Sequence, residues 1–291
     1  MRVLLLGGSG QVGHAFKARN PFKELVLAIR RDCDLTDTEG LRRFVRRAQP
    51  DVIVNAAAYT AVDKAESDRE TCYAVNATAP GIVAQEAKTL GAKLVHYSTD
   101  YVFDGTKAGA YVEEDATGPR NAYGASKLAG ERAIAEAGGE FLILRTSWVY
   151  SNHGTNFLKT MLRLGAERPE LRIVTDQHGA PTSADAIAEA TVRILNSAQA
   201  GQWVTGLFHM TAGGATTWHG FADAIFARAS GRKPALIPIT TAEYPTPAAR
   251  PANSVLANDK FARTFGFRLP EWERQLDAVM AARAAEVHAD T

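Results

Sequence analysis

The stretch VLLLGGSGQVG at residues 3–13 decides the fold of this chain. Its apolar run, residues 3–6, is typical of a strand buried on both faces of a parallel sheet. Glycines follow at 7, 10 and 13 in a GxxGxxG pattern, a close relative of the dinucleotide-binding GxGxxG. Without Cβ atoms they allow a tight turn and close approach of the backbone to a pyrophosphate. We therefore predict a phosphate-binding loop that opens a helix over about residues 11–19.

Outward from this loop, strand-like and helix-like segments alternate. Apolar runs predict strands at 25–29, 51–55, 94–98 and 141–144, and helices are expected over about 38–48, 74–90 and 123–137. Repeated β–α units with buried strands predict an α/β fold: a doubly wound, Rossmann-like parallel sheet.

The pattern loosens beyond residue 150. Helices are expected at about 156–168, 184–196 and 216–229, with short strands at 172–175 and 207–210. Five prolines between Pro234 and Pro251 predict a shaped loop. We expect a dinucleotide-binding domain over 1–150, to which 184–212 returns. Residues 151–291 would form mainly a smaller C-terminal, substrate-binding lobe over the carboxyl edge of the sheet.

Composition argues against several function classes. The 33 basic and 32 acidic side chains leave a net charge of +1, so no nucleic-acid or anionic-membrane partner is expected. The basic run Arg42, Arg43, Arg46 and Arg47 has the spacing of a solvated helix face. No stretch approaches about 20 apolar residues, so no membrane span is expected. Two cysteines without metal-ligand spacing favour a reduced, cytoplasmic protein.

Four histidines of the second half also bear on metal binding. They show neither HxxxH nor HExxH spacing, so we expect no metal site; they are His153, His178, His209 and His219.

The end of the second strand bears on the choice of cofactor. An acidic residue there would bind the ribose 2′-hydroxyl of NADH, whereas this chain has Arg30 and Arg31. Guanidinium groups can pair with a 2′-phosphate, which favours NADPH and leaves NADH as the second cofactor. The alternative is a pair of solvated arginines. Asp34 and Leu35 follow closely and could flank the adenine.

The third strand ends in small residues, Ala56 to Ala58, which let the chain pass close under a cofactor. Tyr59 and Thr60 come next. Asn76, in the following helix, could pin the backbone of this segment.

The fourth strand and the next helix carry the chemistry. Thr99 ends the strand, and Tyr123 and Lys127 form a YxxxK pair four residues apart on one helix face. A free tyrosine has a pKa near 10, and the nearby ammonium of Lys127 is expected to lower it. Tyr123 would donate a proton to the oxygen of a ketone while hydride arrives from nicotinamide, and Thr99 would hydrogen-bond that oxygen.

At this point the sequence resembles the extended short-chain dehydrogenase/reductases, and within them the dTDP-4-dehydrorhamnose reductases. The resemblance spans almost the whole chain. It is carried by GGSGQVG (7–13), PDVIVNAAAYTAVDKAE (50–66), HYSTDYVFDG (96–105), YGASKLAGE (123–131), RTSWVY (145–150), DQHGAPT (176–182), TTWHGFA (216–222) and YPTPAARPANS (244–254).

The resemblance implies NADPH- or NADH-dependent reduction of the C4 ketone of a dTDP-4-dehydro-6-deoxy-L-sugar, giving the dTDP-L-rhamnose used in cell-surface polysaccharide. It implies a dTDP-sugar as partner and leaves a homodimer open. The cofactor residues that it implies are Gly10, Gln11, Val12, Asp34, Leu35, Ala58, Tyr59, Thr60, Tyr97, Tyr123 and Lys127. The loop pattern and the 2′-phosphate argument add Gly7, Gly13 and Arg30, and at Arg30 this chain departs from family members that have an acidic residue there. Thr99, Asp100 and Trp148 would meet the sugar, and Arg250 could bind the diphosphate.

Other interpretations stay open. Trp148 could be core packing, and Arg250 could anchor its loop. Another nucleotide-sugar epimerase or dehydratase could share the scaffold, although a dehydratase commonly has Asp-Glu where this chain has Asp100-Tyr101. A non-catalytic regulatory subunit, like that of methionine adenosyltransferase, is the alternative from a different class.

Overall fold

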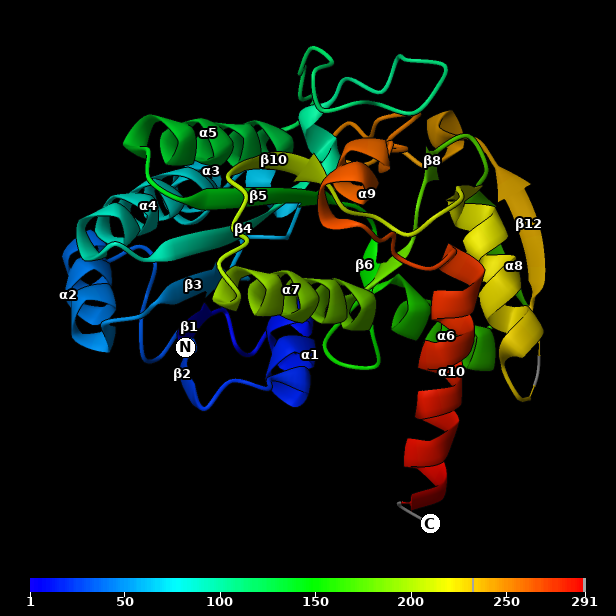
Figure 1. Cartoon of the computed structure of the whole chain (residues 1–291). Coiled ribbons are helices and arrows are strands. Elements are labelled where there is room, and N and C mark those ends of the chain that lie inside the picture. Colours follow the sequence, from blue (N-terminus) through cyan, green and yellow to red (C-terminus); the bar gives the residue numbers. More distant parts are fainter. Residues whose placement is uncertain (232, 290–291) are drawn as a thin grey trace.

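Six parallel strands form the central sheet of the computed structural model, which describes residues 1–231 and 233–289 (Figure 1). The strand order is β10-β5-β4-β3-β1-β2, and every neighbouring pair is parallel. The predicted α/β, doubly wound sheet is confirmed. Its strands are β1 (Arg2–Leu6), β2 (Glu24–Ala28), β3 (Val52–Asn55), β4 (Lys93–Thr99), β5 (Phe141–Thr146) and β10 (Gly206–His209).

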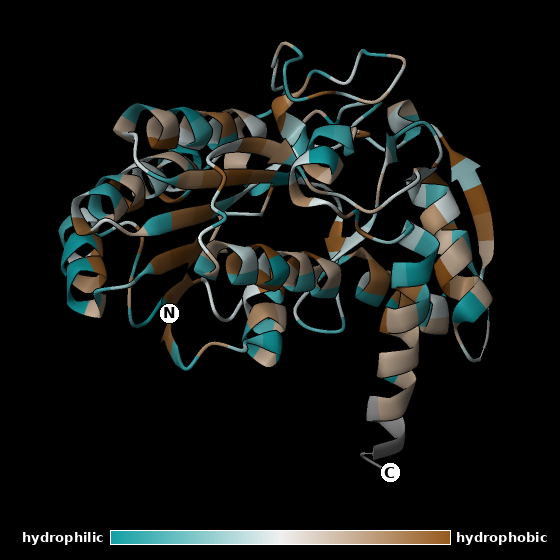
Figure 2. Ribbon diagram, viewed as in Figure 1, coloured by the Kyte–Doolittle hydropathy of each residue, from teal (hydrophilic) through white to brown (hydrophobic). Residues whose placement is uncertain are grey.

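Helices cover both faces of the sheet because successive strand side chains point to opposite faces. Val3 and Leu5 pack toward α1 (Gln11–Arg19) and α7 (Ala184–Gln199), whereas Leu4 and Leu6 face the opposite layer. That layer contains α2 (Thr38–Ala48), α3 (Arg69–Tyr73), the π-helix η2 (Ala74–Thr78), α4 (Ala79–Leu90) and α5 (Ala122–Ala137). In Figure 2 the strands form the hydrophobic centre between these layers.

Polar side chains fix where several helices begin. Each accepts a hydrogen bond from a backbone N–H of the first turn, which would otherwise lack a partner. These residues are Asp37 for α2, Asn121 for α5, Asn156 for α6 (Phe157–Glu167), Ser183 for α7 and Thr217 for α8 (Trp218–Arg228).

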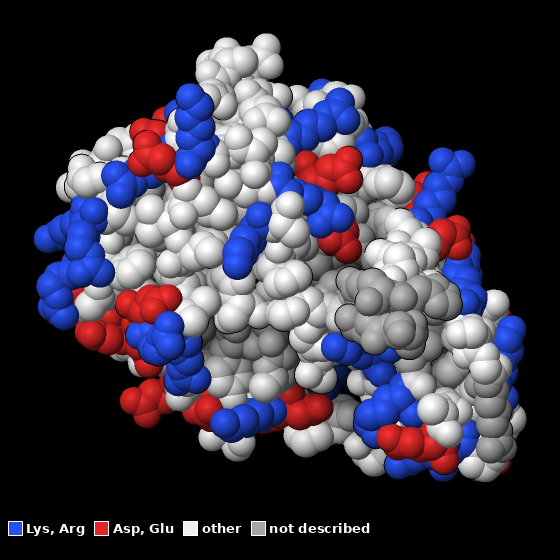
Figure 3. All heavy atoms as spheres, turned by 90° about the horizontal axis from the view of Figure 1, so that it is seen from below, with Lys and Arg blue, Asp and Glu red and all other residues white. Residues whose placement is uncertain are grey.

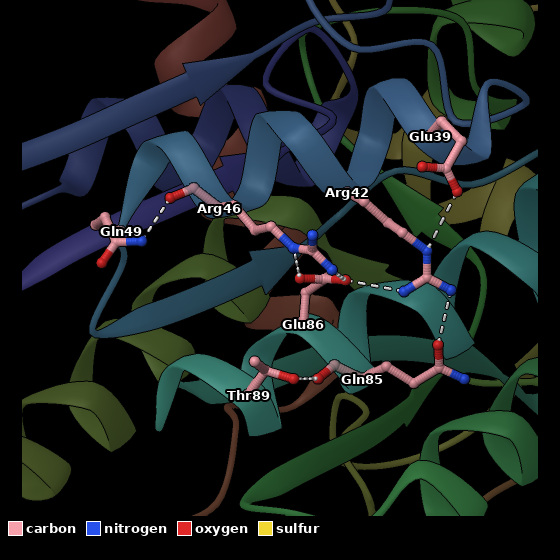
Figure 4. Close-up of polar contacts among 7 residues, drawn as sticks. All are labelled: Glu39, Arg42, Arg46, Gln49, Gln85, Glu86 and Thr89. Atoms are coloured by element: carbon pink, nitrogen blue, oxygen red, sulfur yellow. Dashed lines mark hydrogen bonds and ion pairs between the residues drawn. The ribbon is translucent and has the colours of Figure 1, made fainter.

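The basic face of α2 is not simply solvated, which corrects the sequence prediction (Figure 4). Arg42 Nη1 lies 2.8 Å and Arg46 Nε 2.6 Å from the carboxylate of Glu86 on α4. The side chain of Glu86 is only 2% exposed. Because a buried carboxylate needs charged partners, these two arginines anchor α2 to α4, while Arg43 and Arg47 are exposed.

The remaining elements form a smaller layer beside the carboxyl ends of the strands (Figure 1). Its apolar core joins α6, α8 and α10 (Trp272–Ala289) around Phe221. Short strands pair here: β6 (Val149–Tyr150) with β9 (Thr182–Ser183), β8 (His178–Gly179) with β11 (Thr216–Thr217), and β7 (Glu170–Val174) with β12 (Ala235–Ile239).

The longest elements of the C-terminal part that were not predicted are β12, α9 (Asp259–Phe265) and α10. The proline-rich segment contains the strand β12, and α9 and α10 follow it. β12 tolerates Pro238 because it belongs to a two-stranded sheet, where one side of the strand needs no N–H donor. The prediction of a mostly irregular loop was therefore wrong over residues 235–239.

In the described part of the chain, no helix combines the length and apolar character needed to cross a membrane. On the face drawn in Figure 3, basic and acidic side chains are intermingled, in line with the small net charge.

Candidate active site

A cavity of about 730 Å³ lies at the carboxyl ends of the central strands. This is the edge where doubly wound sheets bind ligands. The cavity brings together most residues predicted to hold the cofactor: Gly7, Gly10, Gln11, Val12, Arg30, Asp34, Leu35, Ala58, Tyr59, Thr60, Tyr97, Tyr123 and Lys127. Gly13, Thr99, Asp100, Trp148 and Arg250 are not among its lining residues.

The glycine loop needs its glycines. Gly7 has φ +81°, and a Cβ there would lie 2.5 Å from the backbone nitrogen of Ala57. A Cβ at Gly13 would lie 2.2 Å from the Gly7 carbonyl oxygen, so Gly13 shapes the loop from behind. Gly10 is the N-cap of α1, where the free N–H groups and helix dipole favour an anion. This cradle fits the pyrophosphate of a dinucleotide.

Gln11 connects the loop to the second half of the chain. Its Oε1 accepts hydrogen bonds from Ser151 Oγ at 3.0 Å and Asn156 Nδ2 at 2.7 Å. Gly154 and Thr155, between these two residues, also line the cavity. Sequence reasoning missed this segment because the partners are 140 and 145 positions from Gln11, with no motif to link them.

Arg30 lies at the rim of the cavity with 82% of its side chain exposed. Its Nε is 3.8 Å from Asp34 Oδ2, a loose contact that leaves the guanidinium free to turn toward a phosphate. Asp34 instead accepts hydrogen bonds from the backbone N–H and hydroxyl of Thr36, and the first of these chiefly lowers the pKa of Asp34. Arg31, 86% exposed, is absent from the lining.

Asn76 pins the segment that follows β3, as predicted. Its Oδ1 accepts from Tyr59 N at 2.8 Å, and its Nδ2 donates to Tyr59 O at 3.0 Å. Asn76 is 1% exposed and lies in the π-helical segment η2, where the helix bulges toward α5. These two hydrogen bonds hold Tyr59 at the cavity wall.

The first turn of α5 places Tyr123 against the end of β4. Asn121 caps the helix through Gly124 N at 2.8 Å, and a Cβ at Gly124 would lie 2.2 Å from Tyr101 O. The helix thus approaches η3 (Asp100–Val102) at backbone distance. The Tyr123 ring meets the Tyr101 ring edge-on, with centroids 6.0 Å apart.

The pKa of Tyr123 differs from the sequence-based expectation. Burial raises it well above the ordinary value, and a hydrogen bond with Thr99 offsets only part of that effect. Lys127 is not among the causes that set this pKa, and Lys127 Nζ donates to Tyr97 O at 2.7 Å. The expected lowering of the tyrosine pKa by Lys127 was wrong for this state. The phenol keeps its proton, as a proton donor must.

Lys127 is 2% exposed and belongs to a buried polar group. Its Nζ lies 3.1 Å from His96 Nε2, and His96 Nδ1 lies 3.1 Å from Asn55 Nδ2. Burial lowers the pKa of Lys127 to about 8, against the opposing charge of Glu131. Sequence reasoning did not select His96 or Asn55 as site residues. They lie opposite each other on the paired strands β4 and β3, and no sequence motif links them.

Thr99 and Asp100, where β4 ends and η3 begins, lie close to the Tyr123 hydroxyl. Thr99 is 5% exposed and donates its hydroxyl hydrogen to Asp100 Oδ1 at 2.9 Å. Burial raises the pKa of Asp100 to about 6, although hydrogen bonds to Ser254 and Thr99 act against it. Asp100 Oδ2 is buried without a partner among the described residues. A sugar hydroxyl would supply the missing hydrogen bond.

Trp148 has an unusual backbone, with φ +47°. Its indole stacks on Trp218, with ring centroids 3.6 Å apart, and a Cβ at Gly179 would lie 2.4 Å from it. A bulky residue adopts a positive φ only where its surroundings impose it, and such residues cluster at functional sites.

The Arg250 side chain is held by contacts with Asp63 and Ala248. Its Nη2 lies 2.9 Å from Asp63 Oδ2 and its Nη1 donates to Ala248 O at 2.8 Å. The side chain is 17% exposed. These contacts favour the loop-anchoring interpretation over diphosphate binding.

The chain has a clear set of relatives. The family model described as "RmlD substrate binding domain" matches residues 1–285. A dTDP-4-dehydrorhamnose reductase of Burkholderia thailandensis is 51% identical over 94% of this chain and 95% of its own. A crystal structure of such a reductase from Clostridium acetobutylicum has a TM-score of 0.92 and 36% identity, covering 98% of this chain and 100% of its own.

A third relative, the dTDP-4-dehydrorhamnose reductase of Bacillus anthracis, was crystallised in complex with NADP. It has a TM-score of 0.91 and 36% identity, over 97% of this chain and 99% of its own. The family model over residues 1–285 and the 51% identical relative, matched over nearly the whole of both chains, lead to one conclusion: this chain belongs to the dTDP-4-dehydrorhamnose reductase (RmlD) family of extended short-chain dehydrogenase/reductases.

Proposed function

We propose that this chain reduces the C4 ketone of dTDP-4-dehydrorhamnose to dTDP-L-rhamnose with NADPH. The observation that carries the proposal is the half-buried phenol of Tyr123 on the wall of the dinucleotide cavity, where desolvation raises the phenol's pKa above its ordinary value. Family membership supplies the substrate class, because the relatives are named for this reaction.

When bound, NADPH would supply the hydride for C4 of the sugar. Tyr123 donates its phenolic proton to the ketone oxygen, so the product hydroxyl receives its hydrogen from this side chain. Thr99 stands beside the phenol and orients that oxygen; it must release its hydrogen bond to Asp100 before it donates to the substrate. Asp100 Oδ2 accepts a sugar hydroxyl, and Lys127 carries the nicotinamide ribose.

NADPH is the cofactor supported by Arg30, whose exposed guanidinium stands at the cavity rim beside the adenosine end. The structure of the Bacillus anthracis relative contains NADP, which is consistent with this choice. NADH is the weaker cofactor, since no carboxylate ends β2 to hold a free 2′-hydroxyl.

Trp148 packs on the sugar nucleotide, and Arg250 anchors its own loop through Asp63 and Ala248. The two cysteines are free and buried, a pattern of reducing compartments, and we place the protein in the cytoplasm. A homodimer remains a separate prediction, checked by sedimentation.

The decisive experiment supplies dTDP-4-dehydrorhamnose and follows the absorbance of NADPH. We expect one NADPH oxidised per sugar and dTDP-L-rhamnose as the product by NMR. The absence of oxidation with the folded enzyme would overturn the proposal. A product epimerised at C4, without net oxidation of cofactor, would assign the chain to the epimerases instead.

A further inference from the structure

His96 is a buried neighbour of the YxxxK lysine that neither the motif nor the proposed reaction uses. It is 0% exposed and lies on β4, between Asn55 on β3 and Lys127 on α5. Because three polar side chains meet here and each is at most 2% exposed, the hydrogen atoms between them must be consistently placed.

Asn55 fixes the first hydrogen. Its Oδ1 accepts the backbone N–H of Ala57 at 3.2 Å, and a backbone N–H can only donate. The amide nitrogen Nδ2 is therefore the atom that faces His96 Nδ1, at 3.1 Å. Since Nδ2 can only donate, Nδ1 must be the acceptor, and a neutral imidazole then carries its proton on Nε2.

That proton points at Lys127. His96 Nε2 lies 3.1 Å from Nζ, which also donates to Tyr97 O at 2.7 Å. An ammonium group has three donors and no lone pair, so a charged Lys127 would put two donors face to face. A neutral amine accepts from His96 Nε2–H and still donates to Tyr97 O, which satisfies every contact.

Turning the Asn55 amide over does not remove the conflict. His96 Nδ1–H would then donate to Oδ1 and Nε2 could accept from an ammonium, but Nδ2 would face the N–H of Ala57. One donor–donor contact remains whenever Lys127 is charged. We propose that His96 is a positioning residue that favours the neutral amine form of Lys127 in the free enzyme.

The other groups around Lys127 bear on its charge as well. Glu131, one turn along α5, favours the ammonium, but Arg145 on β5 neutralises it through contacts of 2.8 and 2.7 Å. The Cys72 thiol on α3 is held protonated by burial. Burial is the main cause that lowers the pKa of His96 well below its ordinary value, and any charge on Lys127 would lower it further, so His96 stays neutral with either form of Lys127.

The inference rests on the proposed function only where it assigns a role in the reaction to the charge of Lys127. If Lys127 is an amine before the cofactor arrives, the enzyme must take up a proton there when the charged form is needed. The hydrogen-bond arrangement itself can be tested without turnover.

The first test uses the wild-type protein labelled with ¹⁵N-histidine. The His96 ring, identified by the signal that His96→Gln removes from the spectrum, should show the neutral Nε2–H tautomer throughout pH 6 to 9. A neutral Nδ1–H tautomer, or an imidazolium that titrates in this range, would overturn the proposal. Failure of the reductase assay would not affect this result.

The second test follows the amine of Lys127 by NMR in ¹³C-lysine protein. In His96→Gln a side-chain carbonyl can face Nζ and accept from the ammonium, so the titration midpoint should rise by about one pH unit, a tenfold change in proton affinity. An unchanged midpoint in a folded variant would contradict the inference.

His209→Gln is the matched control, since His209 is also 0% exposed but its Nδ1 contacts Tyr111 O at 3.1 Å. A merely structural loss would lower stability in both variants and leave the Lys127 midpoint in place. Asn55→Asp adds a further check: its carboxylate can accept from Nδ1–H and should reverse the His96 tautomer.

Discussion

Lys127 Nζ donates to the main-chain oxygen of Tyr97 over 2.7 Å, so the lysine of the YxxxK pair is fastened to strand β4 and not to the tyrosine of its own helix. The helix spacing places Tyr123 and Lys127 on one face, but hydrogen bonds from β4 decide where the amine points. The two residues of the pair thus have different tasks, which separates the effects of changing each.

Replacing Tyr123 by Phe should lower kcat by about 10²- to 10⁴-fold, because the ketone oxygen loses its proton donor. NADPH binding, followed by fluorescence titration, should survive since the ring remains. Tyr150→Phe is the matched control: Tyr150 is 0% exposed in the second apolar core, and its hydroxyl finds no partner among the described residues. Equal turnover in Tyr123→Phe and wild type would remove the phenol from its role.

Replacing Arg30 by Asp should shift the ratio of kcat/KM for NADPH over NADH by at least about tenfold toward NADH, since a charged hydrogen bond to the 2′-phosphate is lost and repulsion takes its place. Steady-state kinetics with both cofactors measures the ratio. Arg31→Asp changes the charge equally but lies outside the cavity lining, and should leave the ratio near its original value. A shift of the same size in both variants would point to the net charge and not to Arg30.

Replacing Asp100 by Asn should stabilise the folded protein at pH 8 by about 1 to 3 kcal/mol while lowering activity. Burial raises the pKa of Asp100 to about 6, so the folded state prefers the protonated carboxyl. Stability from this group is therefore complete below the unfolded pKa near 4 and is lost as the pH rises through about 6.

Urea unfolding at pH 4 and pH 8 measures the free energy of unfolding of Asp100→Asn and of wild type. The gain in stability of the variant should be present at pH 8 and nearly absent at pH 4, where the Asp100 carboxyl of the folded wild type is as neutral as the Asn amide that replaces it. A gain of equal size at the two pH values would show that charge burial is not its cause.

Replacing Trp218 by Ala should raise KM for the sugar nucleotide by about 3- to 10-fold, because Trp148 loses the ring on which it stacks. The Kd for NADPH should be unchanged, as neither tryptophan lines the cofactor cavity. Trp203→Ala, at a tryptophan whose Nε1 donates to nearby Thr205, serves as the control. A KM that stays constant would mean that Trp148 packs in the core and does not meet the substrate.

Short-range patterns in the chain were enough to predict the glycine loop, the sheet and the catalytic pair. The glycine spacing of residues 7–13 predicted the loop, since each glycine answers a local backbone constraint. Strand and helix periodicity predicted the parallel sheet, and α1 and α2 begin and end where their signals lie. The pair Tyr123 and Lys127 was visible because four residues make one helical turn.

Contacts between distant segments, in contrast, became visible only in the folded chain. It paired Lys127 with His96, Arg250 with Asp63 and Trp148 with Trp218, contacts between residues 31, 187 and 70 positions apart. It also placed β12 beside β7, against the local signal of its proline. The same long-range packing half-buries Tyr123, and this desolvation raises a pKa that Lys127 was expected to lower. Such outcomes depend on burial and on partners from other elements, and no local spacing in the chain specifies either.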